Sequence, residues 1–314
     1  MLARMVRETL KPTNVIYTET RRRLRLTGIL SEGRATVINQ IELKMKHYVD
    51  KIDRGLAREL EMYSGSRFHG PLVYATEGGK RIRPIILMMS AETVGYTDDH
   101  LLDAAVAVEL LHTESMIHDD IIDEETSRRG KMTFHVRYGY SSSLLTADFV
   151  FAMILAIAAR YKDKRVADEI SSAALQMAEG EYSELTVDPK NYKLGWDEYV
   201  KIISEKTAAL FQTSAKLGGL IAGASANRVD ALANYGKFVG IAYQLRDDLL
   251  DWGSQDKITR ALLNDSNDGD VISKLRRYSE TYAEKARKEL AVLPENDASA
   301  FLLELTDFAV HRKR

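Results

Sequence analysis

The sequence predicts an all-α protein, built as one large domain of about ten helices. Apolar residues recur at spacings of three and four, as in the run that contains Leu101, Ala105, Val108 and Leu111, and this spacing is typical of helices with a buried face. Alternating apolar and polar residues, which would predict strands, are nearly absent. The breaks between helical segments are short and include no proline-rich linker, so we expect one domain rather than several.

Helical segments follow one another from about Val37 to the C-terminus. They are separated by turn-forming residues at 64–71, 95–99, 128–130, 139–143, 187–195, 222–227, 253–257 and 264–269. The longest apolar run, 149–159, is much shorter than the roughly 20 residues that a membrane-spanning helix needs. We therefore expect a buried core helix there, and no integral membrane protein.

Residues 1–36 are predicted to form a basic extension ahead of the helical domain 37–314. The segment 1–34 contains eight basic and three acidic side chains. A solvated arm, an amphipathic targeting leader and a leader translated from upstream of Met45 all fit this composition. The N-terminus lacks the continuous apolar core of a secretory signal peptide, so the cytoplasm is the expected location.

The composition excludes several classes of function. A chain of 314 residues can bury a large core without covalent staples. The absence of cysteine excludes a disulfide framework, thiolate catalysis and cysteine-based metal sites. With 44 Lys and Arg against 46 Asp and Glu, the net charge is −2. Nucleic-acid-binding proteins usually carry a basic excess, so we expect no nucleic-acid partner.

Two nearly identical acidic segments carry the strongest functional signal. They read Asp-Asp-Ile-Ile-Asp at Asp119–Asp123 and Asp-Asp-Leu-Leu-Asp at Asp247–Asp251. In a helix, positions i and i+4 differ by only about 40° in direction, so the outer carboxylates of each segment share one face. Like charges in an apolar setting are unfavourable unless a cation compensates them. Mg²⁺ holding a diphosphate between the two segments is the hypothesis; two solvated acidic faces, or helix caps, are the alternative.

Both acidic faces continue towards less polar positions. His112 and Ser115 precede Asp119 on the face of the first segment, and Gly236 and Gly240 lie on that of the second. A ligand with a charged head and an apolar tail would fit this gradient. The glycines could equally serve the close packing of two helices.

Basic residues that could bind phosphate occur in three places. They are Lys80 and Arg83 after a pair of glycines, Arg128 and Arg129 directly after the first acidic segment, and Lys206 with Thr207 inside an apolar helix. Backbone N–H groups at a helix start and the planar fork of arginine both suit anions. A basic cluster of this kind, taken alone, is more often a solvated surface. Phosphate binding is favoured here because the three clusters occur in the same chain as the two acidic segments.

These motifs, in this order and spacing, make the chain resemble the trans-isoprenyl diphosphate synthases, or polyprenyl synthetases. The resemblance runs from about Val37 to the C-terminus. It rests on His112 and on the segments GGKRIRP (78–84), HDDIIDEETSRRG (118–130), KTAALF (206–211) and YQLRDDLLD (243–251). It implies a bundle of mostly antiparallel helices around a central cavity, usually as a homodimer. It also implies the 1′-4, head-to-tail condensation of isopentenyl diphosphate with an allylic diphosphate, by ionisation, condensation and elimination.

The resemblance further implies a role for each motif residue. Three Mg²⁺ ions are expected on the allylic diphosphate, held by Asp119, Asp123, Asp247 and Asp251. Asp120 and Asp248 complete the catalytic motifs, and they are expected to interact with the metal ions mostly through bound water. Isopentenyl diphosphate is expected to bind Lys80, Arg83, His112 and Arg129. The allylic diphosphate and the developing cation are expected to contact Arg128, Lys206, Thr207, Gln244 and Lys257.

The chain departs from the family pattern in two places. The family usually has a long glycine- and lysine-rich loop after the second acidic motif, whereas the segment 252–259 is much shorter. Lys257 is the candidate to replace the lysine of that loop at the allylic diphosphate. A Gly-Gln pair common in the family's middle helix is Gly180-Glu181 here.

Product length in this family depends on bulk along the first-motif helix, which places the chain-length pocket at Leu111, Glu114 and Ser115. Geranylgeranyl diphosphate is the expected product, although Glu114 matches neither the aromatic residue nor the small residue found there in family members. Farnesyl and longer polyprenyl diphosphates are alternatives. A subunit of a heteromeric synthase is a further alternative, and so is a class I terpene cyclase. The second acidic motif and the segment 78–84 disfavour the cyclase.

Overall fold

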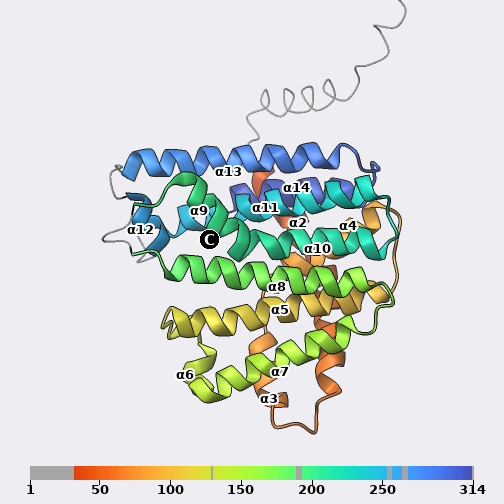
Figure 1. Cartoon of the computed structure of the whole chain (residues 1–314). Coiled ribbons are helices and arrows are strands. Elements are labelled where there is room, and N and C mark those ends of the chain that lie inside the picture. Colours follow the sequence, from red (N-terminus) through yellow and green to blue (C-terminus); the bar gives the residue numbers. More distant parts are fainter. Residues whose placement is uncertain (1–31, 129, 189–192, 253–256, 264–267, 313–314) are drawn as a thin grey trace, which may run out of the picture. The chain divides into compact units, whose positions relative to one another are not determined.

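Helices make up nearly all of the regular structure in the described part of the chain (Figure 1). The computed structural model describes residues 32–128, 130–188, 193–252, 257–263 and 268–312. Contacts divide the chain into two units, Met1–Lys46 and His47–Arg314. Most of the expected extension 1–36 lies outside the described residues, so a boundary near residue 36 stays a prediction.

The predicted all-α class is confirmed. The elements, in chain order, are α2 (Glu32–Glu61), α3 (His69–Thr76), α4 (Ile82–Thr93), α5 (His100–Ile122), β1 (Ser127–Arg128), β2 (Lys131–Met132), α6 (Phe134–Tyr138), α7 (Tyr140–Ala158), α8 (Lys164–Leu185), α9 (Trp196–Ile203), the π-helical turn η1 (Ser204–Ala208), α10 (Ala209–Ile221), α11 (Ala226–Leu250), α12 (Lys257–Leu263), α13 (Asp268–Leu290) and α14 (Asp297–His311). The two short strands pair as an antiparallel hairpin at the break expected near 128–130.

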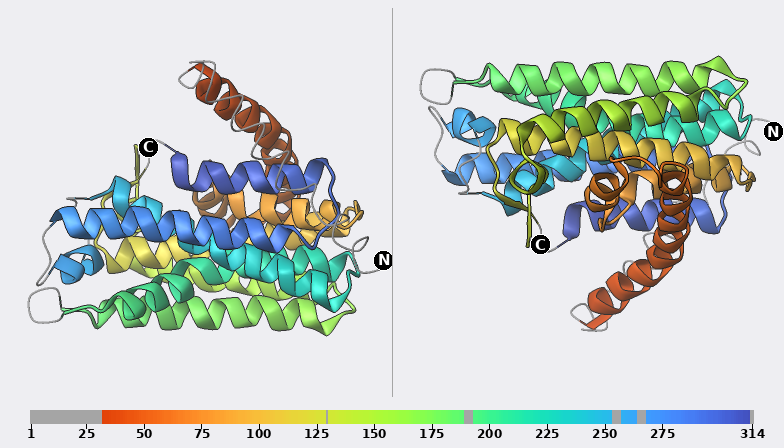
Figure 2. Two further views of the ribbon diagram at one scale, coloured as in Figure 1. Left: turned by 90° about the horizontal axis from the view of Figure 1, so that it is seen from above. Right: turned by 90° about the horizontal axis from the view of Figure 1, so that it is seen from below.

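Helix α5 lies at the centre of the second unit. It packs against α4 on one side and α7 on another, while α10 contacts α4, α5, α8 and α11. Figures 1 and 2 show the long helices α5, α8, α11 and α13 lying side by side along one direction. Leu101, Ala105, Val108 and Leu111 are each at most 2% exposed, as their spacing predicts. Because Leu110 on the other side of α5 is also fully buried, this helix is surrounded by protein along that stretch.

The apolar run predicted to be a buried core helix lies in α7, which is only half-buried. Val150 and Ile154 are fully buried, whereas Leu144 and Leu155 are 53% and 54% exposed. Within the described residues, α7 is the one helix whose length and composition would suit a membrane, and 44% of its apolar window is buried. The sequence run therefore marks a helix with one face in the core and one apolar face at the surface.

The glycines on the second acidic face serve close helix packing. A Cβ atom added at Gly236 would lie 2.4 Å from the carbonyl oxygen of Phe211, and one at Gly240 would lie 2.7 Å from the Cα of Ala208. Both distances are too short for any side chain, so α11 sits backbone to backbone against α10 and η1. Because of this close contact, α11, which ends in the second acidic motif, packs directly against η1, the turn that contains Lys206.

Candidate functional site

Each acidic motif ends a helix in the same way. Helix α5 ends just before Asp123 and α11 just before Asp251, and the backbone N–H of each capping aspartate donates to the carbonyl of Asp119 or Asp247 at 2.9 Å. The C-terminal end of a helix carries partial negative charge, which disfavours carboxylates in its last turn. Both motifs therefore place negative charge at helix ends that disfavour it, and cationic groups nearby have to compensate for it.

Arg83 connects the two motifs. Its guanidinium interacts electrostatically with both Asp119 and Asp247, and it stacks 4.7 Å from the ring centroid of Phe211 on α10. Burial is the main influence on this side chain and lowers the pKa of Arg83. Helices α5 and α11 both pack against α10, so the charges of two carboxylates far apart in sequence act on one guanidinium. That the two motifs face a common ligand space stays a prediction.

The middle aspartate of each motif is held by protein donors. Asp120 accepts a hydrogen bond from Nε of Arg128 at 2.6 Å. Asp248 accepts one from Nε2 of Gln244 at 2.7 Å and another from the hydroxyl of Tyr199. Asp120 and Asp248 are 6% and 5% exposed. These contacts hold the middle aspartates in fixed orientations.

The outer aspartates fit a divalent cation that arrives together with a phosphate ligand. Within the described residues, no three carboxylate or imidazole groups converge into a ready-made cation site. Mg²⁺ typically takes only one or two carboxylates and completes its shell with phosphate oxygens and water. Burial raises the pKa of Asp119 to about 7, against the lowering influence of Lys206. Cation binding at Asp119 would therefore release a proton near neutral pH.

Lys206 is clamped between two glutamates of α8. Its Nζ lies 2.7 Å from Oε2 of Glu181 and 2.9 Å from Oε2 of Glu184. Burial opposes the charge of Lys206, but the negative charges of Glu184, Asp119 and Glu181 outweigh it and raise the pKa. The lysine lies in the π-helical turn η1, a distortion often found at functional sites. The sequence singled out Glu181 but gave no signal for Glu184.

Thr207 and Gln244 form a relay beside Lys206. The hydroxyl of Thr207 donates to Oε1 of Gln244 at 2.9 Å, and the amide of Gln244 donates on to Asp248. These three residues come from η1 and α11, which pack together. The structure brings these side chains together, and their grouping around one ligand stays a prediction.

We expect Gly180→Ala to lower turnover about 100-fold. A Cβ atom at Gly180 would lie 2.3 Å from the backbone nitrogen of Lys206 and 2.8 Å from the carbonyl carbon of Glu205. The added methyl must push η1 away, and a displacement of about 1 Å at a site can cost about 100-fold in rate. Steady-state kinetics would measure it. Gly70→Ala is the matched control, because no atom lies within 4 Å of its added Cβ; equal activity of the two variants would contradict the prediction.

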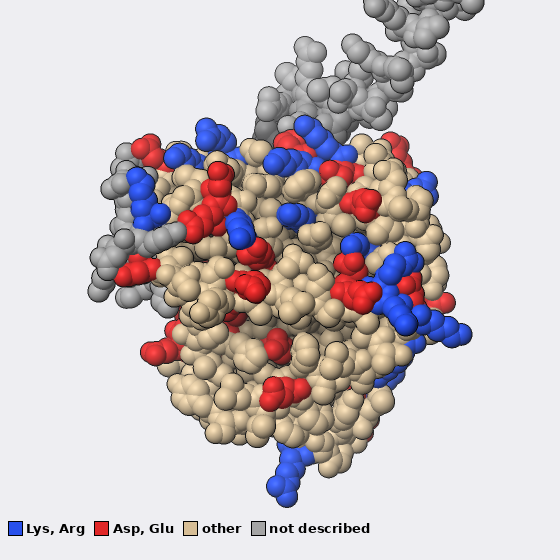
Figure 3. Space-filling view, in the orientation of Figure 1, with Lys and Arg blue, Asp and Glu red and all other residues tan. Residues whose placement is uncertain are grey.

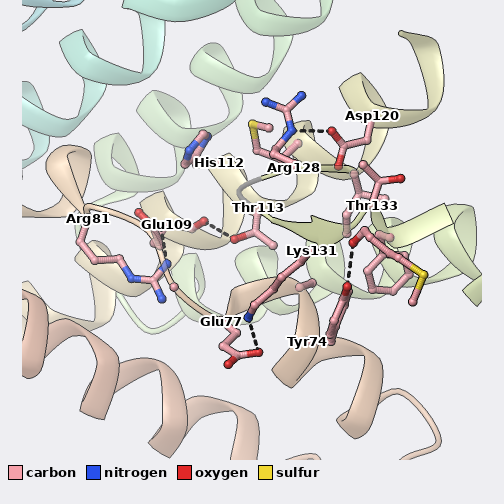
Figure 4. Close-up of a pocket in the computed structure, with 16 residues that line it drawn as sticks. Tyr74, Glu77, Arg81, Glu109, His112, Thr113, Asp120, Arg128, Lys131 and Thr133 are labelled. Carbon is pink, nitrogen blue, oxygen red and sulfur yellow. Dashed lines mark hydrogen bonds and ion pairs between the residues drawn. The ribbon is translucent and has the colours of Figure 1, made fainter. Parts of the chain in front are cut away.

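A cavity of about 290 Å³ opens beside the first motif (Figure 4). Among the residues predicted to bind isopentenyl or allylic diphosphate, His112 and Arg128 line it together with Asp120, whereas Lys80 and Arg83 do not. Lys80 instead lies 5.9 Å from the ring centroid of Phe308 and close enough to Asp247 to lower its pKa, which burial raises. Arg129 and the side chain of Lys257 lie outside the described residues.

None of the three residues predicted to set product length lines the cavity beside the first motif. Leu111 is buried in the core of α5. Oε1 of Glu114 pairs with Nδ1 of His118 at 3.1 Å, and this contact raises the pKa of His118. The hydroxyl of Ser115 donates to the carbonyl of His112 at 3.0 Å. The cavity beside the first motif is lined by other residues of α5, so the chain-length pocket stays a prediction.

Arg81 is a structural residue that the sequence analysis missed. It is 6% exposed, and its guanidinium contacts Glu109 at 2.6 Å, Asp53 at 2.9 Å and the carbonyl of Thr76 at 2.5 Å. Its φ of 51° is left-handed, a conformation that a non-glycine residue adopts only when its surroundings hold it. Arg81 thus anchors the turn that positions Lys80 and Arg83. Its place between those two residues in the segment 78–84 was the available signal.

Comparisons with known proteins agree on one family. The family model described as polyprenyl synthetase matches residues 66–299. The chain is 34% identical over 230 residues to the geranylgeranyl diphosphate synthase of Methanosarcina mazei, covering 71% of this chain and 69% of that relative. It is 32% identical over 259 residues to the short chain isoprenyl diphosphate synthase of Methanocaldococcus jannaschii, covering 81% and 75%. The crystal structure of geranylgeranyl pyrophosphate synthetase from Pyrococcus horikoshii superposes with a TM-score of 0.80 at 27% identity, covering 88% of this chain and 99% of that one.

Proposed function

Because the chain belongs to the polyprenyl synthetase family, we propose that it joins isopentenyl diphosphate to an allylic diphosphate in a trans, 1′-4 condensation, with the cytoplasm as its location. Its class is that of the prenyltransferases. The observation that carries the proposal is that the charges of both Asp119 and Asp247 act on the guanidinium of Arg83. Helices α5 and α11, which end in the two motifs, both pack against α10, and this arrangement supports a shared space that a bound diphosphate could fill.

The proposed site divides into metal-binding and phosphate-binding residues. Mg²⁺ would be held by Asp119, Asp123, Asp247 and Asp251, and when bound it neutralises charge on the departing diphosphate. Lys206, Thr207 and Arg128 contribute positive charge and donors for the allylic diphosphate, with Gln244 orienting Thr207. Lys80, Arg83, His112 and Arg129 are proposed to bind isopentenyl diphosphate, and Lys257 is proposed to bind the allylic diphosphate.

The chemistry follows from fixed charges around the leaving group. The allylic C–O bond breaks and its electron pair leaves with the diphosphate, whose new charge the half-buried Lys206 and the guanidinium of Arg128 stabilise. The double bond of isopentenyl diphosphate then attacks the allylic carbocation, and holding the two substrates in place makes this step effectively intramolecular. Loss of a proton to the released diphosphate forms the new double bond, so the proposal needs no side-chain base.

We propose geranylgeranyl diphosphate as the main product. The support is the identity to a relative of that name over most of this chain. A relative named as a short chain isoprenyl diphosphate synthase and one named as an octaprenyl diphosphate synthase are similar at nearly the same level, so farnesyl and longer polyprenyl diphosphates are the alternatives. Glu114, which pairs with His118, occupies the position before the first motif where family members carry an aromatic or a small residue.

A homodimer is proposed from the apolar surface of α7 and α8. Leu144, Leu145 and Leu155 on α7 are more than half exposed, and so are Leu175 and Tyr182 on α8. The lower part of the face in Figure 3, over α7, carries few charged side chains. Exposed apolar patches of this kind usually mark an interface with another protein.

The testing experiment incubates the purified chain with Mg²⁺, isopentenyl diphosphate and, separately, dimethylallyl, geranyl or farnesyl diphosphate. Mass spectrometry of the products should show metal-dependent elongation that stops at geranylgeranyl diphosphate. Cyclic hydrocarbons formed from an allylic diphosphate alone would identify a cyclase instead. No elongation by a folded chain with any primer would contradict the proposal and favour a subunit that needs a partner.

A further inference from the structure

The C-terminal end of α14 brings a buried arginine onto the second acidic motif. Arg312 is 7% exposed, and its Nη2 donates to Oδ1 of Asp247. The sequence analysis assigned no role to this residue. In the described structure, the positive charge that contacts Asp247 is therefore the guanidinium of Arg312, a side chain of the protein itself.

Three contacts with residues of α11 hold the arginine in place. Its guanidinium carbon lies 3.8 Å from the ring centroid of Tyr243, and Nη1 donates to the hydroxyl of that tyrosine at 3.1 Å. Its backbone carbonyl accepts a hydrogen bond from Nη2 of Arg246 at 2.9 Å. Tyr243 and Arg246 both belong to α11, the helix that carries the motif. Arg312 is thus built into the surroundings of Asp247 rather than resting on it from solvent.

The contact places two cations in competition for one carboxylate. A guanidinium on Oδ1 cancels much of the negative charge that would attract a divalent cation to Asp247. A diphosphate changes this balance, because arginine binds phosphate oxygens at least as well as it binds a carboxylate. With a diphosphate present, Arg312 can move from Asp247 to the phosphate while the divalent cation takes its place.

We propose that Arg312 is a resident counter-ion that keeps divalent cations off Asp247 until a diphosphate arrives. This inference rests on the proposed function, since it takes Asp247 as a metal ligand. Its consequence is an order of events: the second motif binds its cation together with the diphosphate, and binds it weakly beforehand.

The test measures Mn²⁺ binding to the full-length protein by the paramagnetic resonance signal of free Mn²⁺, with and without inorganic pyrophosphate. Without pyrophosphate, Arg312→Gln should bind Mn²⁺ about 10-fold more tightly than the wild type. The enhancement by pyrophosphate should shrink accordingly. Arg165→Gln is the matched control, because Arg165 pairs with Asp163 at 2.6 Å on the exposed start of α8 and should leave Mn²⁺ binding unchanged.

Unchanged or weaker Mn²⁺ binding by Arg312→Gln would overturn the proposal, and weaker binding would mean that Arg312 orients Asp247 for the metal. If circular dichroism shows that this variant is unfolded, Tyr243→Phe takes its place. It removes one hydrogen-bond acceptor of Arg312 and should shift Mn²⁺ binding in the same direction by about 2-fold; no shift would again overturn the proposal. If the wild-type protein elongates isoprenoids but Arg312→Gln does not bind Mn²⁺ more tightly, this inference alone is wrong. If the wild-type protein neither elongates isoprenoids nor binds Mn²⁺ in the presence of pyrophosphate, the proposed function is wrong.

Discussion

Replacing Asp119 by asparagine is expected to lower turnover at least about 1000-fold while leaving the fold intact. Asparagine keeps the shape of the side chain and removes its charge, so packing around the end of α5 should not change. The lost carboxylate is one of the outer pair of the first motif and interacts with Lys206 and Arg128. Removing one group that stabilises charge in a transition state typically costs about 100- to 1000-fold, and loss of a metal ligand adds to that.

The measurement is kcat with saturating Mg²⁺ and both diphosphates, with thermal unfolding as the check on folding. Glu179→Gln is the matched control, because Glu179 is an exposed carboxylate on α8. The control should retain wild-type activity. Wild-type kcat in Asp119→Asn would contradict the assignment of this residue to the metal.

Replacing Arg81 by methionine is expected to destabilise the protein by about 3–5 kcal/mol. The change leaves Glu109, which is 4% exposed, as a buried carboxylate without its guanidinium partner at 2.6 Å. Breaking a buried ion pair by removing one member costs about this much, since the remaining charge stays desolvated. The free energy of unfolding in urea measures the loss.

Two further variants serve as controls for the Arg81→Met prediction. The double variant Arg81→Met with Glu109→Met should recover most of the lost stability, because replacing both members of a buried pair by apolar groups is often neutral. Arg165→Met removes an exposed pair with Asp163 and should cost less than about 1 kcal/mol. A loss below about 1 kcal/mol in Arg81→Met would mean that Glu109 finds another partner.

The buried face of a helix and the side chains that share one face were predictable, because both follow from the spacing of residues within a short segment of sequence. The face of α5 that contains Leu101 and Val108 follows from a spacing of three and four residues, and both residues are buried. The outer aspartates of each motif share a face because one helical turn separates them. The half-buried state of α7 was not predictable, since an apolar run reads the same whether its second face meets the core or an exposed surface.

The sequence by itself determined the helical class, the two acidic motifs and the basic residues around them, because periodicity and spacing along one helix need no knowledge of the rest of the chain. Only the tertiary structure decided the pairing of these charges. Lys206 lies between Glu181 and Glu184, Arg81 lies against Glu109, and Arg312 lies on Asp247. Each pair joins residues from different parts of the fold, and a contact of that kind depends on how the helices pack.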